Sequence, residues 1–189
     1  MNQRMRLVSL TAAATVALCS FAAPSADAAA AKPIPGGSNQ KRSVEGCMNA
    51  WLFNGVWRMR ATGIEPIEDF GTKGLGVKVE LRNGTTKNLQ PSQSGTGGQG
   101  EGIELVAADG NALNVDAGAF QTQLGYKTVV QSGTIKTVLR FHFAQPADAD
   151  AFKPVKLIVQ FDQKNVHVTG VKLAQDPSFR VNLTCGGST

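Results

Sequence analysis

The sequence predicts an all-β protein, folded as an antiparallel sandwich of about eight or nine strands. Three observations carry this prediction. After Val44, apolar and polar residues alternate with a period of two, which is typical of strands that bury one face. Helical periodicity is nearly absent. The strand-like segments are joined by turns without crossover helices, which favours a sandwich or a barrel, and of these we favour the two-sheet sandwich.

Individual strands can be read from the alternation. It is clearest in four segments, residues 77–81, 139–143, 155–161 and 179–183. It is weaker in five more, residues 56–62, 103–106, 113–115, 126–130 and 166–172. Asn83-Gly84 supplies the positive φ angles of a tight turn after the first clear strand. Residues 108–111 predict a hairpin turn, and Asp148 and Asp150 predict another turn rather than a calcium site.

The N-terminus predicts export. Arg4 and Arg6 precede an apolar run over residues 7–23, and Ala26-Asp27-Ala28 begins a small-residue cleavage site. We therefore expect residues 1–30 to be a removable signal peptide, residues 31–43 a flexible linker and residues 44–189 the folded domain. A retained membrane anchor is the poorer interpretation, because the run is rich in alanine. Cys19 raises the alternative of a lipoprotein, but Leu18 before it argues against lipidation.

The charge of the chain limits the classes of partner that we expect it to bind. The formal net charge is +5, and lysine and arginine are scattered singly along the chain. A nucleic-acid binder carries clustered cations, so we expect no nucleic-acid partner. The expected location is secreted or periplasmic, and the expected partner is a protein or polysaccharide of the envelope or the extracellular space.

Two cysteines remain after processing, Cys47 and Cys185. Because export delivers them to an oxidising compartment, we expect a disulfide that joins the first strand to the last. Extending the last strand by two residues places Cys185 on its core face, so the bridge should be buried. Two buried free thiols are the alternative.

Residues 90–102 interrupt the strand pattern with glycine, serine, glutamine and threonine. A loop of this length is either functional or disordered. Since it contains no aromatic residue, arginine or histidine, we expect a mobile loop that folding does not need.

The segment around both tryptophans holds the candidate binding surface: Trp51, Phe53, Arg58 and Arg60. In one interpretation Trp51, Phe53 and Trp57 form an aromatic platform for a sugar or a peptide, beside the two arginines. In the other, Trp57 and Met59 point into the core and Trp51 packs against the disulfide. Aromatic residues dominate core energetics, which favours the second interpretation.

No catalytic, metal or cofactor site is expected. His142 and His167 fall on the outward faces of predicted strands, and no carboxylate lies two or four positions from either. Two histidines are too few for a zinc or copper site, so both should be solvated. A nucleophile also needs a histidine base held by a third group, and the sequence shows no such context.

A family resemblance comes from the order of four motifs: residues 79–85, Asp109-Gly110, Ser132-Gly133 and residues 139–143. Over about residues 56–161, this order resembles a family of bacterial exported domains of unknown function described as telokin-like. The resemblance implies an immunoglobulin-like β-sandwich and supplies no residues with known roles.

These observations lead us to expect a non-enzymatic exported module that binds or presents to another component. Two alternatives stay open. A proteinase inhibitor would show an exposed rigid loop. A hydrolytic enzyme would place His142 or His167 in a cleft beside a carboxylate.

Overall fold

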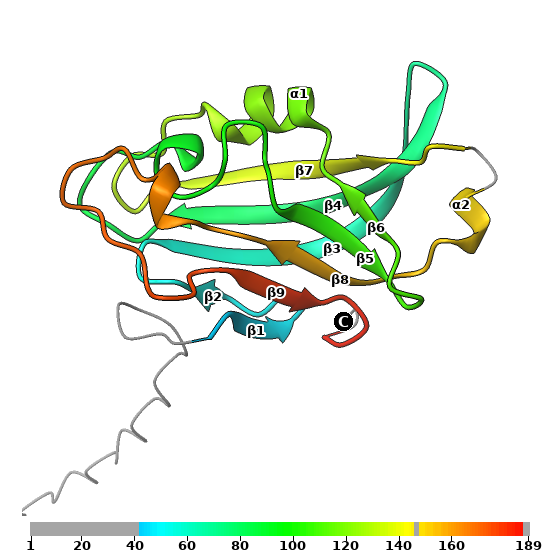
Figure 1. Ribbon diagram of the computed structural model, residues 1–189, viewed down its shortest axis with the longest axis horizontal. Coiled ribbons are helices and arrows are strands. Elements are labelled where there is room, and N and C mark those ends of the chain that lie inside the picture. Colours follow the sequence, from blue (N-terminus) through cyan, green and yellow to red (C-terminus); the bar gives the residue numbers. More distant parts are fainter. Residues whose placement is uncertain (1–41, 146–147, 187–189) are drawn as a thin grey trace, which may run out of the picture. The chain divides into compact units, whose positions relative to one another are not determined.

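The computed structural model describes residues 42–145 and 148–186; the predicted signal peptide and residues 31–41 of the linker lie outside them. Two packed sheets make up the fold (Figure 1). One sheet has the order β1 (Val44–Cys47), β9 (Phe179–Asn182), β8 (Pro154–Val159), β5 (Ile103–Ala107) and β6 (Ala112–Asn114). The other has the order β2 (Leu52–Phe53), β3 (Trp57–Asp69), β4 (Thr72–Asn83) and β7 (Thr134–His142). The predicted all-β sandwich is confirmed, with one parallel pair, β1 and β9, among antiparallel ones.

The core lies between the two sheets, where the inward residues of each strand meet. From β3 and β4 it takes Trp57, Met59, Val77, Val79 and Leu81, and from the facing sheet Leu105, Leu157, Val159, Phe179 and Val181. Each strand contributes alternate residues, because successive side chains point to opposite faces. The alternation in the sequence therefore located most of the core.

Two predicted strands are absent from the described structure. Residues 126–130 and 166–172 contribute only isolated bridges, Leu89 with Val129 and Ser94 with Val166. Each segment follows a short helical turn, η2 (Gln121–Gly125) or η3 (Gln163–Asn165), and its first backbone N–H donates into that turn. One residue of each segment pairs with another part of the chain and the pairing does not extend to its neighbours, so the alternation there does not yield strands. Asp148 and Asp150, for which we predicted a turn, begin the four-residue helix α2 (Asp148–Ala151).

The prediction of a mobile loop at residues 90–102 is wrong. This segment contains the helical turn η1 (Pro91–Gln93), and many of its residues are buried. Gly95 has φ +127°, and a Cβ atom there would lie 2.7 Å from Cδ1 of Phe161. The indole Nε1–H of Trp57 donates to the carbonyl and hydroxyl oxygens of Ser94. The segment packs through its backbone instead of through apolar side chains, which is why its composition suggested disorder.

Strands β3 and β4 form a long hairpin whose turn is Phe70-Gly71. Both turn residues have positive φ, 50° and 81°. The pairing of β4 with β7 begins at Gly74, opposite His142, so the hairpin projects beyond the end of β7 (Figure 1). Asp69, near the tip of this hairpin, therefore comes within hydrogen-bond distance of His142, the last residue of β7.

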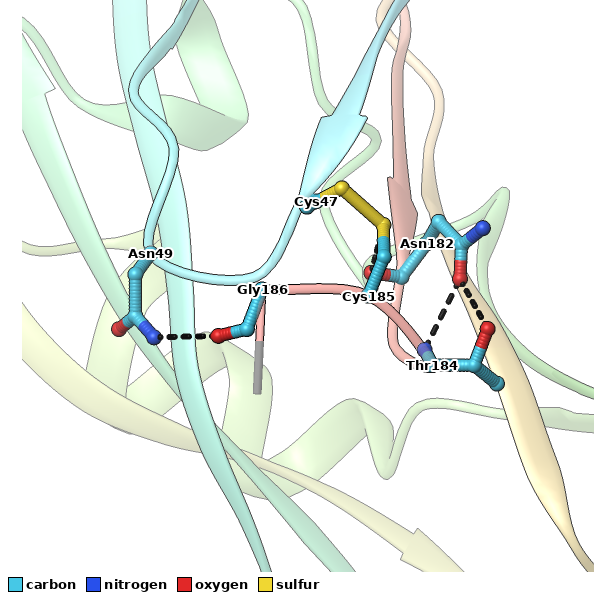
Figure 2. The surroundings of a disulfide bond; sticks show 6 residues. All are labelled: Cys47, Asn49, Asn182, Thr184, Cys185 and Gly186. Carbon is cyan, nitrogen blue, oxygen red and sulfur yellow. Dashed lines mark hydrogen bonds between the residues drawn. A yellow bond between two sulfur atoms is a disulfide. The ribbon is translucent and has the colours of Figure 1, made fainter. Parts of the chain in front are cut away.

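Cys47 and Cys185 form the predicted disulfide, with their Cα atoms 5.1 Å apart. Both cysteines are only partly buried, so the expectation of a core-facing bridge is wrong. The reason is that β9 ends at Asn182, whose side-chain Oδ1 accepts hydrogen bonds from the backbone N–H and the hydroxyl of Thr184 (Figure 2). Leu183 is still buried, but the strand has ended in this turn, and Cys185 beyond it is only partly buried.

Candidate functional site

Two groups of side chains stand out on the outer face of the four-stranded sheet, the face that points away from the core. One lies at the tip of the β3–β4 hairpin and the other at the opposite ends of β3 and β4. In each group, residues that are distant in sequence come together through strand register.

At the hairpin tip, Asp69 accepts hydrogen bonds from two side chains of β7. Arg140 Nη1 lies 2.6 and 2.5 Å from the two carboxylate oxygens of Asp69. His142 Nε2 lies 2.9 Å from Oδ2 of the same carboxylate. Glycine at position 74 lets β4 lie close to the end of β7, because a Cβ atom there would lie 2.3 Å from the carbonyl oxygen of Phe141 and 3.1 Å from Cδ2 of His142. The end of β3 is therefore bound to the end of β7.

A second carboxylate reaches His142 from the other side. Asp116 caps the short helix α1 (Ala117–Phe120), and its Oδ1 accepts the backbone N–H of Ala119 at 2.6 Å. Its backbone N–H donates to the carbonyl oxygen of Arg140, which fixes the cap beside β7. Its Oδ2 lies 3.5 Å from Nδ1 of His142. The imidazole thus lies between two carboxylates, and its side chain is only 22% exposed.

The charges at the tip favour an ionised Asp69 carboxylate. Hydrogen bonds from Arg140, and then from His142, hold the pKa of Asp69 below its usual range. Arg140 Nε is buried and has no hydrogen-bond partner among the described residues. The guanidinium therefore keeps a buried and unused Nε–H donor at this site.

A pocket of about 550 Å³ opens beside this cluster. Phe70 lies on its rim at the hairpin tip, with its side chain fully exposed at 109%. We name this region the hairpin-tip site; its pocket is lined by Asp69, Phe70, Thr72, Asp116, Ala119, Gln123, Arg140 and His142.

Sequence reasoning missed this site. His142 was expected to be solvated, and that expectation is wrong because its partners come from other strands and loops, 73 positions away in the case of Asp69. One signal was present: Gly71 precedes a segment whose apolar residues alternate over 75–81, and a glycine before such a strand favours a hairpin turn. His167, by contrast, is exposed.

The chemistry open to His142 is limited by its neighbours. Nε2 is engaged by the Asp69 carboxylate, and Nδ1 lies 3.5 Å from Oδ2 of Asp116, so a substrate would have to approach the ring between two carboxylates. The pocket lining contains no serine or cysteine, and Thr72 supplies its one hydroxyl group. Within residues 42–145 and 148–186, no three His, Cys, Asp or Glu side chains are arranged to hold a metal ion. The arrangement fits binding better than nucleophilic catalysis.

The second group contains the candidate binding surface proposed from the sequence. The guanidinium of Arg58 lies 4.7 Å from the ring centre of Phe53, and that of Arg60 lies 4.7 Å from the ring of Trp51. Trp57 does not belong to it, because its side chain is 0% exposed in the core. Trp51 is partly buried and stacks with Arg60.

Arg60 also forms an ion pair inside this group. Its Nε and Nη2 lie 3.0 and 2.8 Å from Oε2 of Glu80, and Lys136 Nζ lies 3.3 Å from Oε1. Burial of the Glu80 carboxyl opposes its ionisation, but the hydrogen bonds from Arg60 and then Lys136 outweigh this and hold the pKa of Glu80 below its usual range. Arg60 thus shares the Glu80 carboxylate with Lys136.

The two packed sheets define the chain as a β-sandwich protein. No family model matches its sequence, and no curated protein matches it. The secreted protein MPT63 of Mycobacterium tuberculosis is similar in structure, with 12% identity and a TM-score of 0.46 over 76% of this chain and 99% of that one. An uncharacterised β-sandwich protein of Clostridium difficile 630 is also similar, with 12% identity and a TM-score of 0.44 over 76% of this chain and 96% of that one.

Among the described residues, no helix is long and apolar enough to cross a membrane.

Proposed function

We propose that the protein is an exported, non-enzymatic binding module that contacts a protein of the envelope or the extracellular space through the hairpin-tip site. The observation that carries this proposal is Phe70, a fully exposed aromatic side chain at a projecting tip. Aromatic residues of this kind anchor protein interfaces by filling a pocket on the partner. The disulfide agrees with an oxidising compartment.

The backbone of Phe70 strengthens the argument. Its φ of 50° lies in the left-handed region, which costs a residue other than glycine about 1 kcal/mol or more. The Phe70 side chain is fully exposed, so burial of the ring does not offset the cost of this backbone conformation. The stability of the fold therefore does not explain a phenylalanine at this position. A strained and exposed residue fits a role in contact with another molecule.

The hairpin is held in place directly before Phe70, which lowers the entropy that the tip loses when it binds a partner. Asp69, next to Phe70, is held by Arg140 and His142. A loop that is ordered before contact loses less entropy when it binds. The tip therefore presents Phe70 in a defined position.

A photoreactive benzophenone side chain at position 70 tests the proposal in cells that export the protein. Position 130 is the matched control, because Val130 is also exposed, at 57%, and lies close to the far end of β4. We expect covalent adducts with a defined protein from position 70 and not from position 130. Adducts that are absent from position 70, or identical at both positions, would overturn the proposal.

A hydrolytic enzyme is the second candidate, since His142 lies in a pocket beside carboxylates, as such an enzyme would require. A panel of ester, peptide and glycoside substrates tests it with the parent protein and the His142→Gln variant. Turnover by the parent that His142→Gln abolishes would favour the enzyme. A proteinase inhibitor is less well supported, because the two-residue turn Phe70-Gly71 is too short to lie extended in a protease cleft.

A further inference from the structure

Two arginines lie side by side at the end of the sheet opposite the hairpin tip. Arg58 of β3 and Arg82 of β4 are directly paired in register, and both point to the outer face. Like charges directly opposite each other on neighbouring strands destabilise a sheet. Thr134 of β7 continues the same row.

Other cations on this face have partners, but these two do not. Arg60 and Lys136 pair with Glu80, and Lys78 pairs with Glu65 at 2.7 Å. Over the described part of the chain, no carboxylate lies within ion-pair distance of Arg58 or Arg82. The fold thus keeps two adjacent positive charges without neutralising them.

Stacking holds one of the two in place. The guanidinium of Arg58 lies over the ring of Phe53, which orients the group and leaves its charge unpaired. The ring of Phe53 lies close to the chain at Gly84, where a Cβ atom would lie 2.9 Å from its Cε2 atom. Arg82 is exposed beside this fixed arginine.

We propose that Arg58 and Arg82 together bind the carboxylate groups of an acidic polysaccharide that lies across the outer face of the four-stranded sheet. A fixed guanidinium fork matches the geometry of a carboxylate. A bound anion would also remove the repulsion between the two arginines, which explains why the fold tolerates the pair.

The arrangement of the remaining cations favours a linear polymer. The next row along the strands, roughly 7 Å away, holds Arg60 and Lys136 against the single carboxylate of Glu80, so it keeps an excess of one positive charge. Lys78 in the row after that is paired with Glu65. A polymer with an acidic group on each repeat would meet an excess of positive charge in both of the first two rows. A lipid surface fits less well, because the exposed large apolar side chains, Phe70, Tyr126 and Val130, all lie outside β3, β4 and β7.

Binding of polygalacturonate to the disulfide-bonded protein tests this proposal. We expect Arg58→Gln and Arg82→Gln each to weaken binding by about tenfold, the effect of losing one charged hydrogen bond. Lys172→Gln is the control: it removes one exposed cation from outside the four-stranded sheet, and should change affinity by about twofold or less. Arg58→Lys keeps the charge and should still weaken binding, because lysine lacks the fork.

Folding is checked in the same samples. Polygalacturonate should raise the Tm of the parent and leave that of the Arg58→Gln/Arg82→Gln double variant unchanged. Three outcomes would overturn the proposal: no binding by the parent, an equal loss in Lys172→Gln, or tighter Arg82-dependent binding to duplex DNA, inorganic polyphosphate or phosphatidylserine vesicles. Adducts at position 70 do not depend on Arg58 or Arg82, so failure here leaves the proposed function standing.

Discussion

The Nε2 atom of His142 lies 2.9 Å from the Oδ2 atom of Asp69, and this contact joins the last residue of β7 to the last residue of β3. Arg140 donates to the same carboxylate. Asp69 is therefore the point at which the projecting hairpin is held to the rest of its sheet.

The Asp69 carboxylate should stabilise the fold in a pH-dependent way. Its pKa is lowered in the folded protein by hydrogen bonds from Arg140 and His142, so its contribution is complete above the unfolded pKa and is lost as the pH falls through the folded one. We expect the difference in free energy of unfolding between the parent and Asp69→Asn to shrink as the pH falls from about 5 to about 2. Urea unfolding at each pH measures this difference. A difference that stays constant over this range would contradict the prediction.

Replacing Phe70 should make the protein more stable. Phe70→Asn places a residue that tolerates left-handed backbone at the first position of the turn, so we expect a gain of about 1 kcal/mol in the free energy of unfolding. Urea unfolding gives the stability, and the Phe70→Ala variant separates loss of the ring from relief of strain. A loss of stability in Phe70→Asn would show that the ring supports the fold.

Within residues 90–102, an added methyl group should lower the free energy of unfolding at Gly95 but not at Gly98. Gly95→Ala adds a methyl group 2.7 Å from Phe161 at φ +127°, and we expect it to cost about 2–4 kcal/mol. Gly98→Ala meets nothing closer than 4.0 Å and should leave stability unchanged or raise it by up to about 1 kcal/mol. Thermal or urea unfolding of the two variants compares them directly. Equal behaviour would mean that the segment does not pack as described.

Trp57 should contribute strongly to stability. Trp57→Ala removes a fully buried indole and its hydrogen bonds to Ser94, and the expected cost is about 3–5 kcal/mol. Trp51→Ala is the control, because Trp51 is only partly buried, and its cost should be markedly smaller. A Trp57→Ala protein as stable as the parent in urea would contradict the placement of this residue in the core.

Local patterns were sufficient for part of the fold. The alternation of Trp57 with Met59, and of Phe179 with Val181, indicated which side chains face the core, because burial of one strand face leaves a period of two in the sequence. The disulfide could be predicted because only two cysteines remain in the expected mature chain.

Features that depend on register or on backbone packing could not be predicted in this way. His142 meets Asp69 because β4 pairs with β7 from Gly74 onwards, and no short segment contains that register. The pairing of Arg58 with Arg82 arises in the same way. Gly95 is buried against Phe161 without an apolar side chain of its own, so composition alone suggested disorder.

The disulfide also determines how the domain would respond to mechanical tension. It links the end of β1 to the residues just after β9, two strands that lie parallel and hydrogen-bonded. A pull applied near Ser43 and Gly186 would act along these parallel strands and would pass from β1 through the sulfur–sulfur bond to Gly186. The residues between the two cysteines, which include nearly the whole sandwich, would carry none of that load. In the reduced protein the same pull would reach the two sheets and could unravel them.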